Sequence, residues 1–230
     1  MSVKNLEESM KTWNKIAKSF DQTRKKTWGE CIEFIDSFSQ EYIIADIACG
    51  NGRHLIPASK NCKIAIGLDL SIELLKIVNE KINNNDVDNV VLVNSDACNI
   101  PLKSNTLDGV LFIAALHNIK GQENRIKALS ETKRVLKKDS KALISVWSRW
   151  QEKYRKEFFK KFFKSFGQDE FGDIDIYWRQ HGLNIPRFYH LYSKREFKND
   201  LIKAGFEIVD FKELKMTSQN HADNFFAVVK

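Results

Sequence analysis

The stretch Tyr42–Asn61, YIIADIACGNGRHLIPASKN, decides the fold. It begins with the apolar run Ile43–Ala45, which is typical of a parallel strand buried on both faces. Asp46 follows this run, and a turn of small residues, Ala48–Gly52, comes before a helix expected from Arg53. Small residues let a ligand approach the backbone, and the free N–H groups of a first helical turn attract an anionic group. The stretch therefore predicts a nucleotide-type pocket at the carboxyl end of a parallel strand.

Two patterns compete for this turn. A dinucleotide-binding fold needs G-x-G-x-x-G, but Leu55 stands where the third glycine belongs. The alternative is the D-x-[GA]-x-G-x-G pattern of class I S-adenosylmethionine (SAM) methyltransferases. Four residues here resemble it: Asp46, Ala48 (in place of the commoner glycine), Gly50 and Gly52. A glycine turn that only connects a strand to a helix is the third alternative.

The composition indicates one globular domain over residues 1–230. Hydrophobic residues make up 43% of the chain, and there are only three prolines. The net charge of +7 favours an acidic partner such as RNA. The four cysteines are scattered without a C-x-x-C pair, so we expect reduced thiols and no metal site. There is no signal peptide and no apolar run long enough to span a bilayer, so we expect a cytoplasmic protein without a membrane partner.

Two further apolar segments are expected to be strands that end in acids. KIAIGLD ends in Asp69, whose carboxylate can accept both ribose hydroxyls of a nucleoside while Ser71 caps the next helix. VVLVNSDA reaches Asp96 beside Ala97, where the acid can accept a hydrogen bond from an adenine amino group. Because the carboxyl ends of parallel strands meet at one edge of a sheet, Asp46, Asp69 and Asp96 together predict a SAM pocket.

The remaining segments complete a known architecture. A fourth strand reaches Ala114, a helix follows over Gln122–Lys137, and a fifth strand covers Lys141–Trp147. Near the C-terminus, FEIVDFKEL and FFAVVK are two strands separated by a short polar loop. The sequence thus predicts a Rossmann-like α/β fold with the seven-stranded class I methyltransferase sheet. This sheet is mostly parallel, has a C-terminal antiparallel hairpin and carries helices on both faces.

Two segments lie outside this core. Residues 1–40 are expected to be helical and to form an N-terminal lid over the cofactor pocket. Residues 149–190 are interpreted as an insertion for substrate recognition, beginning with an amphipathic helix over 149–166 that is rich in aromatic and basic residues. The aromatic stripe favours packing on the core, and the basic face is a candidate contact for RNA phosphates.

These motifs resemble the tRNA wobble-uridine methyltransferase family, which converts 5-carboxymethyluridine to its methyl ester. The opening WNKIAKSFDQTRKKTW fits the family's IA-x-x-F-x-x-TR-x-x-x-W pattern, and RFYHLYSKREFKNDLIKAGF fits a second specific segment. The resemblance spans nearly the whole chain, although its SAM motifs are generic. One departure concerns the substrate edge, because His117–Asn118 stands where the family commonly has two histidines.

The motifs and the resemblance together give the candidate site residues. Those expected to bind SAM are Arg24, Trp28, Asp46, Ala48, Cys49, Gly50, Gly52, Asp69, Leu70, Asp96, Ala97 and Ala114. Arg24 is a candidate for gripping the methionine carboxylate of SAM. Arg187 and His190 are candidates for holding a substrate carboxylate, with His117 near the transferring methyl group. Pairing of Arg187 with a surface acid and a purely structural role for His190 stay open as alternatives.

The resemblance also implies partners. These are tRNA as the substrate and a small zinc-binding activator protein that adds a strand to an exposed sheet edge. A small-molecule methyltransferase acting on an acceptor such as a quinone precursor shares every cofactor motif and is the first alternative. A non-catalytic SAM-fold subunit that binds RNA or a partner is the second.

Overall fold

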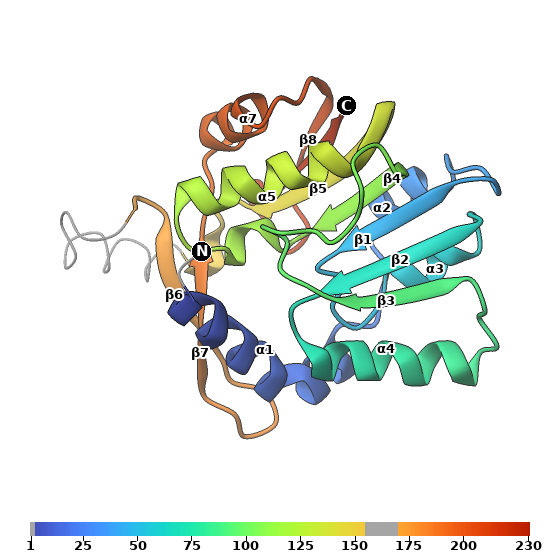
Figure 1. The fold of residues 1–230 in the computed structure, drawn as a ribbon. Helices are drawn as coiled ribbons and strands as arrows, with labels where there is room; N and C mark the ends of the chain where they lie inside the picture. Colours follow the sequence, from blue (N-terminus) through green and yellow to red (C-terminus); the bar gives the residue numbers. More distant parts are fainter. Residues whose placement is uncertain (1–2, 155–169) are drawn as a thin grey trace.

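The computed structural model describes residues 3–154 and 170–230 and is built on a seven-stranded sheet with the order β3-β2-β1-β4-β5-β9-β8 (Figure 1). The strands are β1 (Ile43–Ile47), β2 (Ile64–Asp69), β3 (Val90–Asn94), β4 (Leu107–Ile113), β5 (Leu136–Trp147), β8 (Ile208–Leu214) and β9 (Asn224–Val229). The first five run parallel, and β9 pairs antiparallel with both β5 and β8. The predicted fold class, including the C-terminal antiparallel hairpin, is therefore confirmed.

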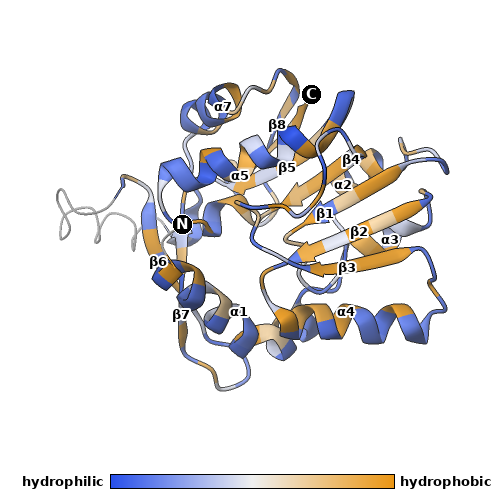
Figure 2. Ribbon diagram, viewed as in Figure 1, coloured by the Kyte–Doolittle hydropathy of each residue, from blue (hydrophilic) through white to orange (hydrophobic). Residues whose placement is uncertain are grey.

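Helices cover both faces of this sheet because the central strands are apolar on both sides (Figure 2). One core forms against α2 (Gly29–Ile35), α3 (Leu55–Ser59) and α4 (Ile72–Asn84). The other forms against α5 (Gln122–Val135) and α7 (Lys194–Lys203). In β1 the alternation is direct, since Ala45 and Ile47 enter one core and Ile44 the other. None of the helices in the described ranges combines the length and hydropathy needed to cross a membrane.

A second, two-stranded sheet stands beside the main one. It consists of β6 (Asp173–Trp178) and β7 (Ile185–His190), which pair antiparallel, with α1 (Val3–Thr23) next to it (Figure 1). The sequence analysis assigned no strand to this region, although the alternation of Ile174, Ile176 and Trp178 is a strand signal. Two short 3-10 turns, η1 (Leu116–Asn118) and η2 (Glu152–Tyr154), lie before and after β5. The predicted helix over 149–166 falls mostly outside the described residues.

The boundary between α5 and β5 differs from the predicted one. The helix ends at Val135 instead of Lys137, and β5 begins at Leu136 instead of Lys141. Leu136 is buried and pairs with Leu107 ahead of a register shift, so the strand starts where an apolar side chain can enter the core. Residues 138–140, which the sequence analysis left between the helix and the strand, are thus part of β5.

Helix α1 is held by side chains at two places. Asn14 accepts hydrogen bonds from the Ser71 hydroxyl (2.7 Å) and the Glu73 backbone N–H (3.3 Å) at the start of α4. Ser19 accepts a hydrogen bond of 2.8 Å from the Trp178 indole of β6. The helix therefore connects the main sheet to the β6–β7 hairpin on the side where the parallel strands end.

We expect Gly67→Ala to lower the free energy of unfolding by about 1–3 kcal/mol, since overpacking a close-packed core costs this much. A Cβ at Gly67 would lie 2.4 Å from a Leu55 methyl and 3.0 Å from a Leu92 methyl. Gly29→Ala is the matched control, because a Cβ there meets no atom within 4 Å. Urea unfolding of both variants makes the comparison, and equal stabilities would contradict the packing described for β2.

Candidate active site

A pocket opens at the carboxyl ends of β1, β2, β3 and β4, where the sequence predicted it. The predicted residues that line it are Arg24, Trp28, Asp46, Ala48, Cys49, Gly50, Asp69, Leu70, Asp96, Ala97, Ala114 and Arg187. The structure does not bring Gly52, His117 or His190 to its lining. Residues from α1 and β7 also line the pocket, so it lies between the main sheet, the N-terminal helix and the hairpin.

Asp69 organises the part of this pocket where the sequence predicted the cofactor, which we call the cofactor end. One carboxylate oxygen accepts the Gly50 backbone N–H at 2.8 Å, and the other accepts the Ser71 backbone N–H at 2.8 Å. Each oxygen keeps a second lone pair, so the carboxylate can still accept two hydroxyl groups. Burial raises the pKa of Asp69 to about 6, against the lowering effect of these hydrogen bonds.

The two glycines of the turn have different tasks. Gly50 has a φ of +57°, and a Cβ there would touch only the Phe20 ring at 3.5 Å, so its backbone is open towards the pocket. Gly52 has a φ of +76°, and a Cβ there would lie 3.1 Å from Val78 of α4. Gly52 therefore serves the packing of the turn against α4, which explains why it does not reach the pocket surface.

Asp46 and Asp96 line the same end of the pocket. Asp46 is buried, and burial raises its pKa to about 8 although Arg53 lies nearby. One of its carboxylate oxygens has no hydrogen-bond partner. Asp96 accepts the Cys98 backbone N–H at 2.9 Å through one oxygen, which fixes the side chain at the end of β3.

Unpartnered polar groups concentrate at this pocket. Among the described residues, nine have a buried side-chain nitrogen or oxygen without a hydrogen-bond partner. Six of the nine line the pocket: Asp46, Asn51, His54, Ser95, Asn118 and Arg187. Because buried polar groups are normally satisfied, this concentration is what a site shaped for a polar ligand presents. The carboxylates and small residues of the cofactor end fit a nucleoside such as that of SAM.

Three arginines also line the pocket. Arg24, Arg53 and Arg187 all contribute to its surface, and in the described ranges none of them forms an ion pair with a carboxylate. Burial lowers the pKa of Arg53 to about 10, which leaves it charged at neutral pH. Arg53 lies over the Trp28 ring at 4.6 Å, and Arg24 over the Trp178 ring at 5.4 Å. The pocket thus contains both buried carboxylates and arginines that have no carboxylate partner among the described residues.

Arg187 is enclosed by aromatic rings. Its guanidinium lies 4.8 Å from the Trp178 ring, 5.0 Å from the Tyr189 ring and 5.8 Å from the Trp13 ring. Its Nη1 donates a hydrogen bond of 2.6 Å to the Tyr189 hydroxyl, while its Nε has no partner. Since the Tyr189 oxygen accepts from Arg187, the hydroxyl hydrogen is free to donate elsewhere. Two donors from one strand are therefore available to an anionic group.

His117 lies behind the pocket wall. Its Nδ1 accepts the Trp147 backbone N–H at 3.1 Å, and its ring stacks on Tyr189 with centroids 5.2 Å apart. The side chain is fully buried, and burial lowers its pKa to about 3, so it is neutral. Trp147 and Tyr189 line the pocket in its place. His117 can support these two residues, and the structure does not give it contact with a ligand.

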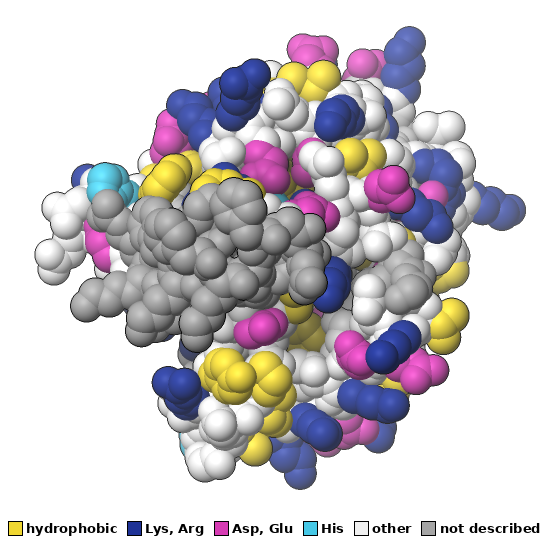
Figure 3. All heavy atoms as spheres, turned by 90° about the vertical axis from the view of Figure 1, so that its left-hand side faces the viewer, with side chains coloured by type: hydrophobic (Ala, Val, Ile, Leu, Met, Phe, Trp, Pro, Cys, Tyr) yellow, Lys and Arg dark blue, Asp and Glu magenta, His cyan; other side chains and the backbone are white. Residues whose placement is uncertain are grey.

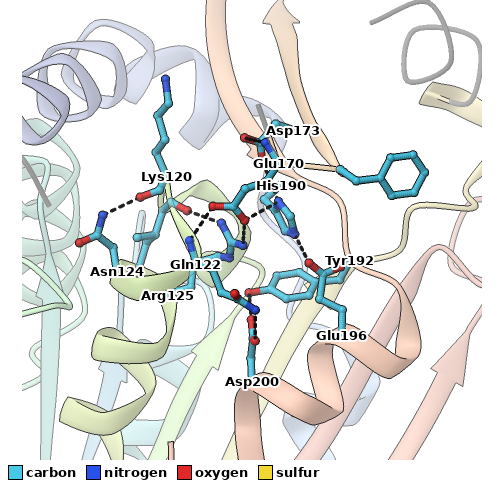
Figure 4. Close-up of polar contacts among 12 residues, drawn as sticks. Lys120, Gln122, Asn124, Arg125, Glu170, Asp173, His190, Tyr192, Glu196 and Asp200 are labelled. Atoms are coloured by element: carbon cyan, nitrogen blue, oxygen red, sulfur yellow. Dashed lines mark hydrogen bonds and ion pairs between the residues drawn. The ribbon is translucent and has the colours of Figure 1, made fainter. Parts of the chain in front are cut away.

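His190 belongs to a buried charge network instead of the pocket (Figure 4). Its Nδ1 contacts Asp173 at 2.7 Å and its Nε2 contacts Glu196 at 2.9 Å. Burial alone would lower the pKa of His190, but the hydrogen bonds with the two carboxylates raise it. Both ring nitrogens are used, so the structural alternative for His190 agrees with its position. The prediction that it holds a substrate carboxylate does not.

The same network contains a group that offers metal ligands. Glu170, Asp173 and His190 have ligand atoms within 4.8 Å of one another. Arg125, a fully buried residue of α5, contacts Glu170 at 2.5 Å, and Asp173 is engaged by His190. Cations of the protein itself thus balance these carboxylates. We interpret the group as the ionic connection between the hairpin, α5 and α7.

Comparisons with known proteins agree with this geometry. The family model described as "Methyltransferase domain" matches residues 45–144. A solved SAM-dependent methyltransferase from Methanosarcina mazei superposes with a TM-score of 0.73 at 20% identity, covering 89% of this chain and 97% of that one. Residues 45–144 therefore match a methyltransferase domain, the fold is that of class I SAM-dependent methyltransferases, and the pocket fits SAM, the cofactor of that class.

The chain is further similar to proteins named tRNA (carboxymethyluridine(34)-5-O)-methyltransferase. The one from Schizosaccharomyces pombe is 28% identical over 218 residues, which cover 86% of this chain and 88% of that protein. The one from Xenopus tropicalis, alkbh8, is 35% identical over 146 residues, or 64% of this chain. The chain spans only 22% of the length of the Xenopus relative.

Sequence reasoning missed several residues of the pocket. They are Trp13, Arg53, His54, Ser95, Asn118, Trp147 and Tyr189. Tyr189 could have been predicted, because it stands two residues from Arg187 and alternate residues of a strand share a face. Arg53 directly follows the glycine turn, where an anionic group was expected. Trp13 and His54 reach the pocket only through the way α1 and α3 pack, and no local pattern marks them.

We expect SAM affinity to fall as the pH is lowered from 7 to 5, by roughly tenfold. Ribose hydroxyls donate to ionised Asp69, so binding lowers its pKa from the value of about 6 in the free protein. Affinity is then nearly constant above that value and decreases as the pH falls through it. Calorimetric titration of SAM makes the measurement.

Asp69→Asn should bind SAM weakly at pH 7 and show little further loss at pH 5. Asp88→Asn is the control, because Asp88 is exposed at the far end of β3. An equal affinity of the wild type at both pH values would contradict the role of Asp69.

Proposed function

We propose that this protein transfers the methyl group of SAM to the 5-carboxymethyl group of the wobble uridine in tRNA and forms a methyl ester. The observation that carries the proposal is Arg187, which is 6% exposed, lines the cofactor pocket and has no carboxylate partner in the described residues. A buried guanidinium without a counterion fits an anionic acceptor. The names of the relatives from Schizosaccharomyces pombe and Xenopus tropicalis support the choice of tRNA and of carboxymethyluridine.

For this reaction the protein mainly has to position SAM and the acceptor carboxylate. Bound SAM supplies a methyl group activated on a sulfonium. A carboxylate is ionised at neutral pH, so one of its oxygens can form the new bond to the methyl carbon without a general base. The bond between the methyl carbon and the sulfonium sulfur breaks in the same step, and the rest of SAM leaves as a neutral thioether. Arg187 Nε and the Tyr189 hydroxyl are the donors that would hold the carboxylate and replace its water. The reaction needs no general base, which agrees with the position of His117 outside the pocket lining.

SAM and the acceptor would contact different groups of residues in the pocket. Asp69 and Asp96 would bind the ribose and adenine of SAM, as the sequence suggested. Arg24 and Arg53, which face the same pocket from the loop after α1 and from the glycine turn, would bind the methionine carboxylate. That leaves Arg187, on the separate hairpin, for the acceptor.

The other parts of the proposal concern organisation. Residues 1–230 would act as one domain in the cytoplasm, and residues 1–40 as a lid over the cofactor. The contacts of Asn14 with α4 and of Ser19 with Trp178, together with the position of Phe20 over Gly50, support the lid. The hairpin, which lies within residues 149–190, would recognise the substrate.

We expect Arg187→Gln to raise the KM for tRNA by roughly 10- to 100-fold, because a hydrogen-bonded charge pair contributes about 1.5–3 kcal/mol. The Kd for SAM should change little, since Arg187 serves the acceptor. Arg195→Gln is the control, because Arg195 is exposed on α7. A loss of SAM affinity equal to the loss of methyl transfer would move Arg187 to the cofactor end.

The test of the proposed function is transfer of radiolabelled methyl from SAM to bulk tRNA taken from a strain without this protein. Nucleoside mass spectrometry then identifies the product. A base-labile methyl ester on the wobble uridine is the expected result. Label on another base would discard the ester chemistry, and SAM binding without any labelled tRNA would favour a small-molecule acceptor.

We also propose that an activator protein adds a strand to β3. This strand is at one edge of the sheet, its sequence VVLVN has no charge, and Val91 is 50% exposed. The opposite edge, β8, carries Asp210, Lys212 and Glu213 and has a register shift, which are features that block strand addition. The resemblance suggests that the partner binds zinc.

We expect Val91→Lys to weaken co-purification of a co-expressed zinc-binding activator at least tenfold, because a lysine on an edge disfavours strand addition. Val209→Lys on β8 is the matched control, since Val209 is 45% exposed on the other edge. SAM binding should be unchanged in both variants. A loss of the partner in Val209→Lys alone would place the interface on β8.

A further inference from the structure

The β6–β7 hairpin has two faces with different surroundings. In its register Ile176 pairs with Arg187 and Ile174 with Tyr189. This inner face carries Arg187 and Tyr189, and we call the part of the pocket around these two residues the acceptor end, after the proposed function. Side chains alternate along each strand, so the pairs between these ones point the other way. Tyr177 pairs with Pro186 on that opposite side.

We define the outer face as Asp175, Tyr177, Pro186 and Phe188, which the register places on one side of the hairpin. Tyr177 is 47% exposed, Pro186 is exposed and Phe188 is half-buried. The described residues contain two other large aromatic side chains that are exposed, Trp150 and Phe171, and Phe171 stands two residues before β6. Figure 3, which views this side of the molecule, shows hydrophobic side chains next to basic ones.

A cation accompanies each aromatic ring of the outer face. The Arg179 guanidinium lies 5.5 Å from the Tyr177 ring centre, and the Lys120 ammonium lies 5.8 Å from the Phe188 ring centre. In the described ranges neither cation forms an ion pair, so both charges are available to a ligand. Asp175, the acid on this face, is engaged in an interaction within the protein.

We propose that the outer face binds unpaired nucleotides of the RNA acceptor, next to the nucleotide that enters the pocket. A base can stack on Tyr177, and adjacent phosphates can pair with Arg179 and Lys120. The inner and outer faces belong to one two-stranded hairpin. An RNA strand that passes over the edge of the hairpin therefore contacts both faces. The inference rests on the proposed function and adds where the loop of the RNA is held.

Unpaired RNA fits this face better than a protein partner does. Isolated exposed rings with nearby cations provide stacking and charge but little continuous apolar area. A duplex would offer its phosphates to the cations and no base to Tyr177, because its bases are already stacked on one another. The net charge of +7 adds a general attraction for nucleic acid.

Binding of a synthetic anticodon stem-loop that carries 5-carboxymethyluridine tests whether the outer face holds unpaired RNA. Fluorescence anisotropy gives its Kd for the wild type, Tyr177→Ser and Arg179→Gln. Each variant should weaken binding roughly tenfold, which corresponds to about 1.4 kcal/mol. Ile202→Ser and Arg195→Gln on α7 are the controls, as they remove an exposed apolar and an exposed basic side chain elsewhere.

Further readouts separate stacking from other effects. Tyr177→Ser should leave the Kd for SAM unchanged, which also shows that the variant is folded. It should leave binding of a blunt RNA duplex unchanged, and Arg179→Gln should reduce the salt dependence of loop binding. Equal losses for loop and duplex in Tyr177→Ser, or loop binding within twofold of the wild type in both variants, would overturn the proposal. The proposal would also be overturned if the wild type were a dimer and Tyr177→Ser were a monomer, because the outer face would then be a dimer interface.

The outcome also distinguishes this inference from the proposed function. If the wild type methylates the stem-loop and the variants bind it normally, the proposed function stands and the proposal that the outer face binds RNA is wrong. If the wild type binds the loop through Tyr177 without methylating it, the RNA surface stands and the ester chemistry fails.

Discussion

The carboxylate of Asp69 is the constraint on which the rest of the site depends. It ends β2, yet its two oxygens hold the backbone of Gly50, in the turn after β1, and of Ser71, at the start of α4. One buried acid thus fixes the distance between two strand ends and aims the glycine turn. Burial raises its pKa to about 6, so the structure tolerates a poorly solvated carboxylate at this point. Such a group is positioned for a ligand that can donate to it.

Helix α1 extends this arrangement to the other side of the pocket. Asn14 shares the cap of α4 with Ser71, and Ser19 connects to Trp178 of the hairpin. The cofactor end and the acceptor end therefore share one helix as a common wall. These contacts on both sides of the pocket support the proposal that α1 is a lid.

The sequence predicts the sheet and the cofactor end because local patterns encode them. Buried strands read as apolar runs, and each is followed by a small residue or an acid at a fixed place, as at Ala48, Asp69 and Asp96. The acceptor end is different. Trp13, Trp147 and Tyr189 come from three distant segments, and only packing brings them together. His117 and His190 illustrate the limit of sequence-based prediction. A motif gives the residue type but does not show whether the side chain faces a ligand or is hydrogen-bonded inside the protein.

The contrast between the two groups of charges around the hairpin explains which of them can serve a ligand. In the network of Arg125, Glu170 and His190, opposite charges meet within the protein and hold the hairpin to α5 and α7 (Figure 4). In the pocket, Arg187 is also buried, at 6% exposure, but it is surrounded by aromatic rings in place of acids. A buried charge without a partner is costly unless a ligand completes it. The ionic network secures the hairpin, and the hairpin in turn holds Arg187, without a carboxylate partner among the described residues, in the part of the pocket proposed for the acceptor.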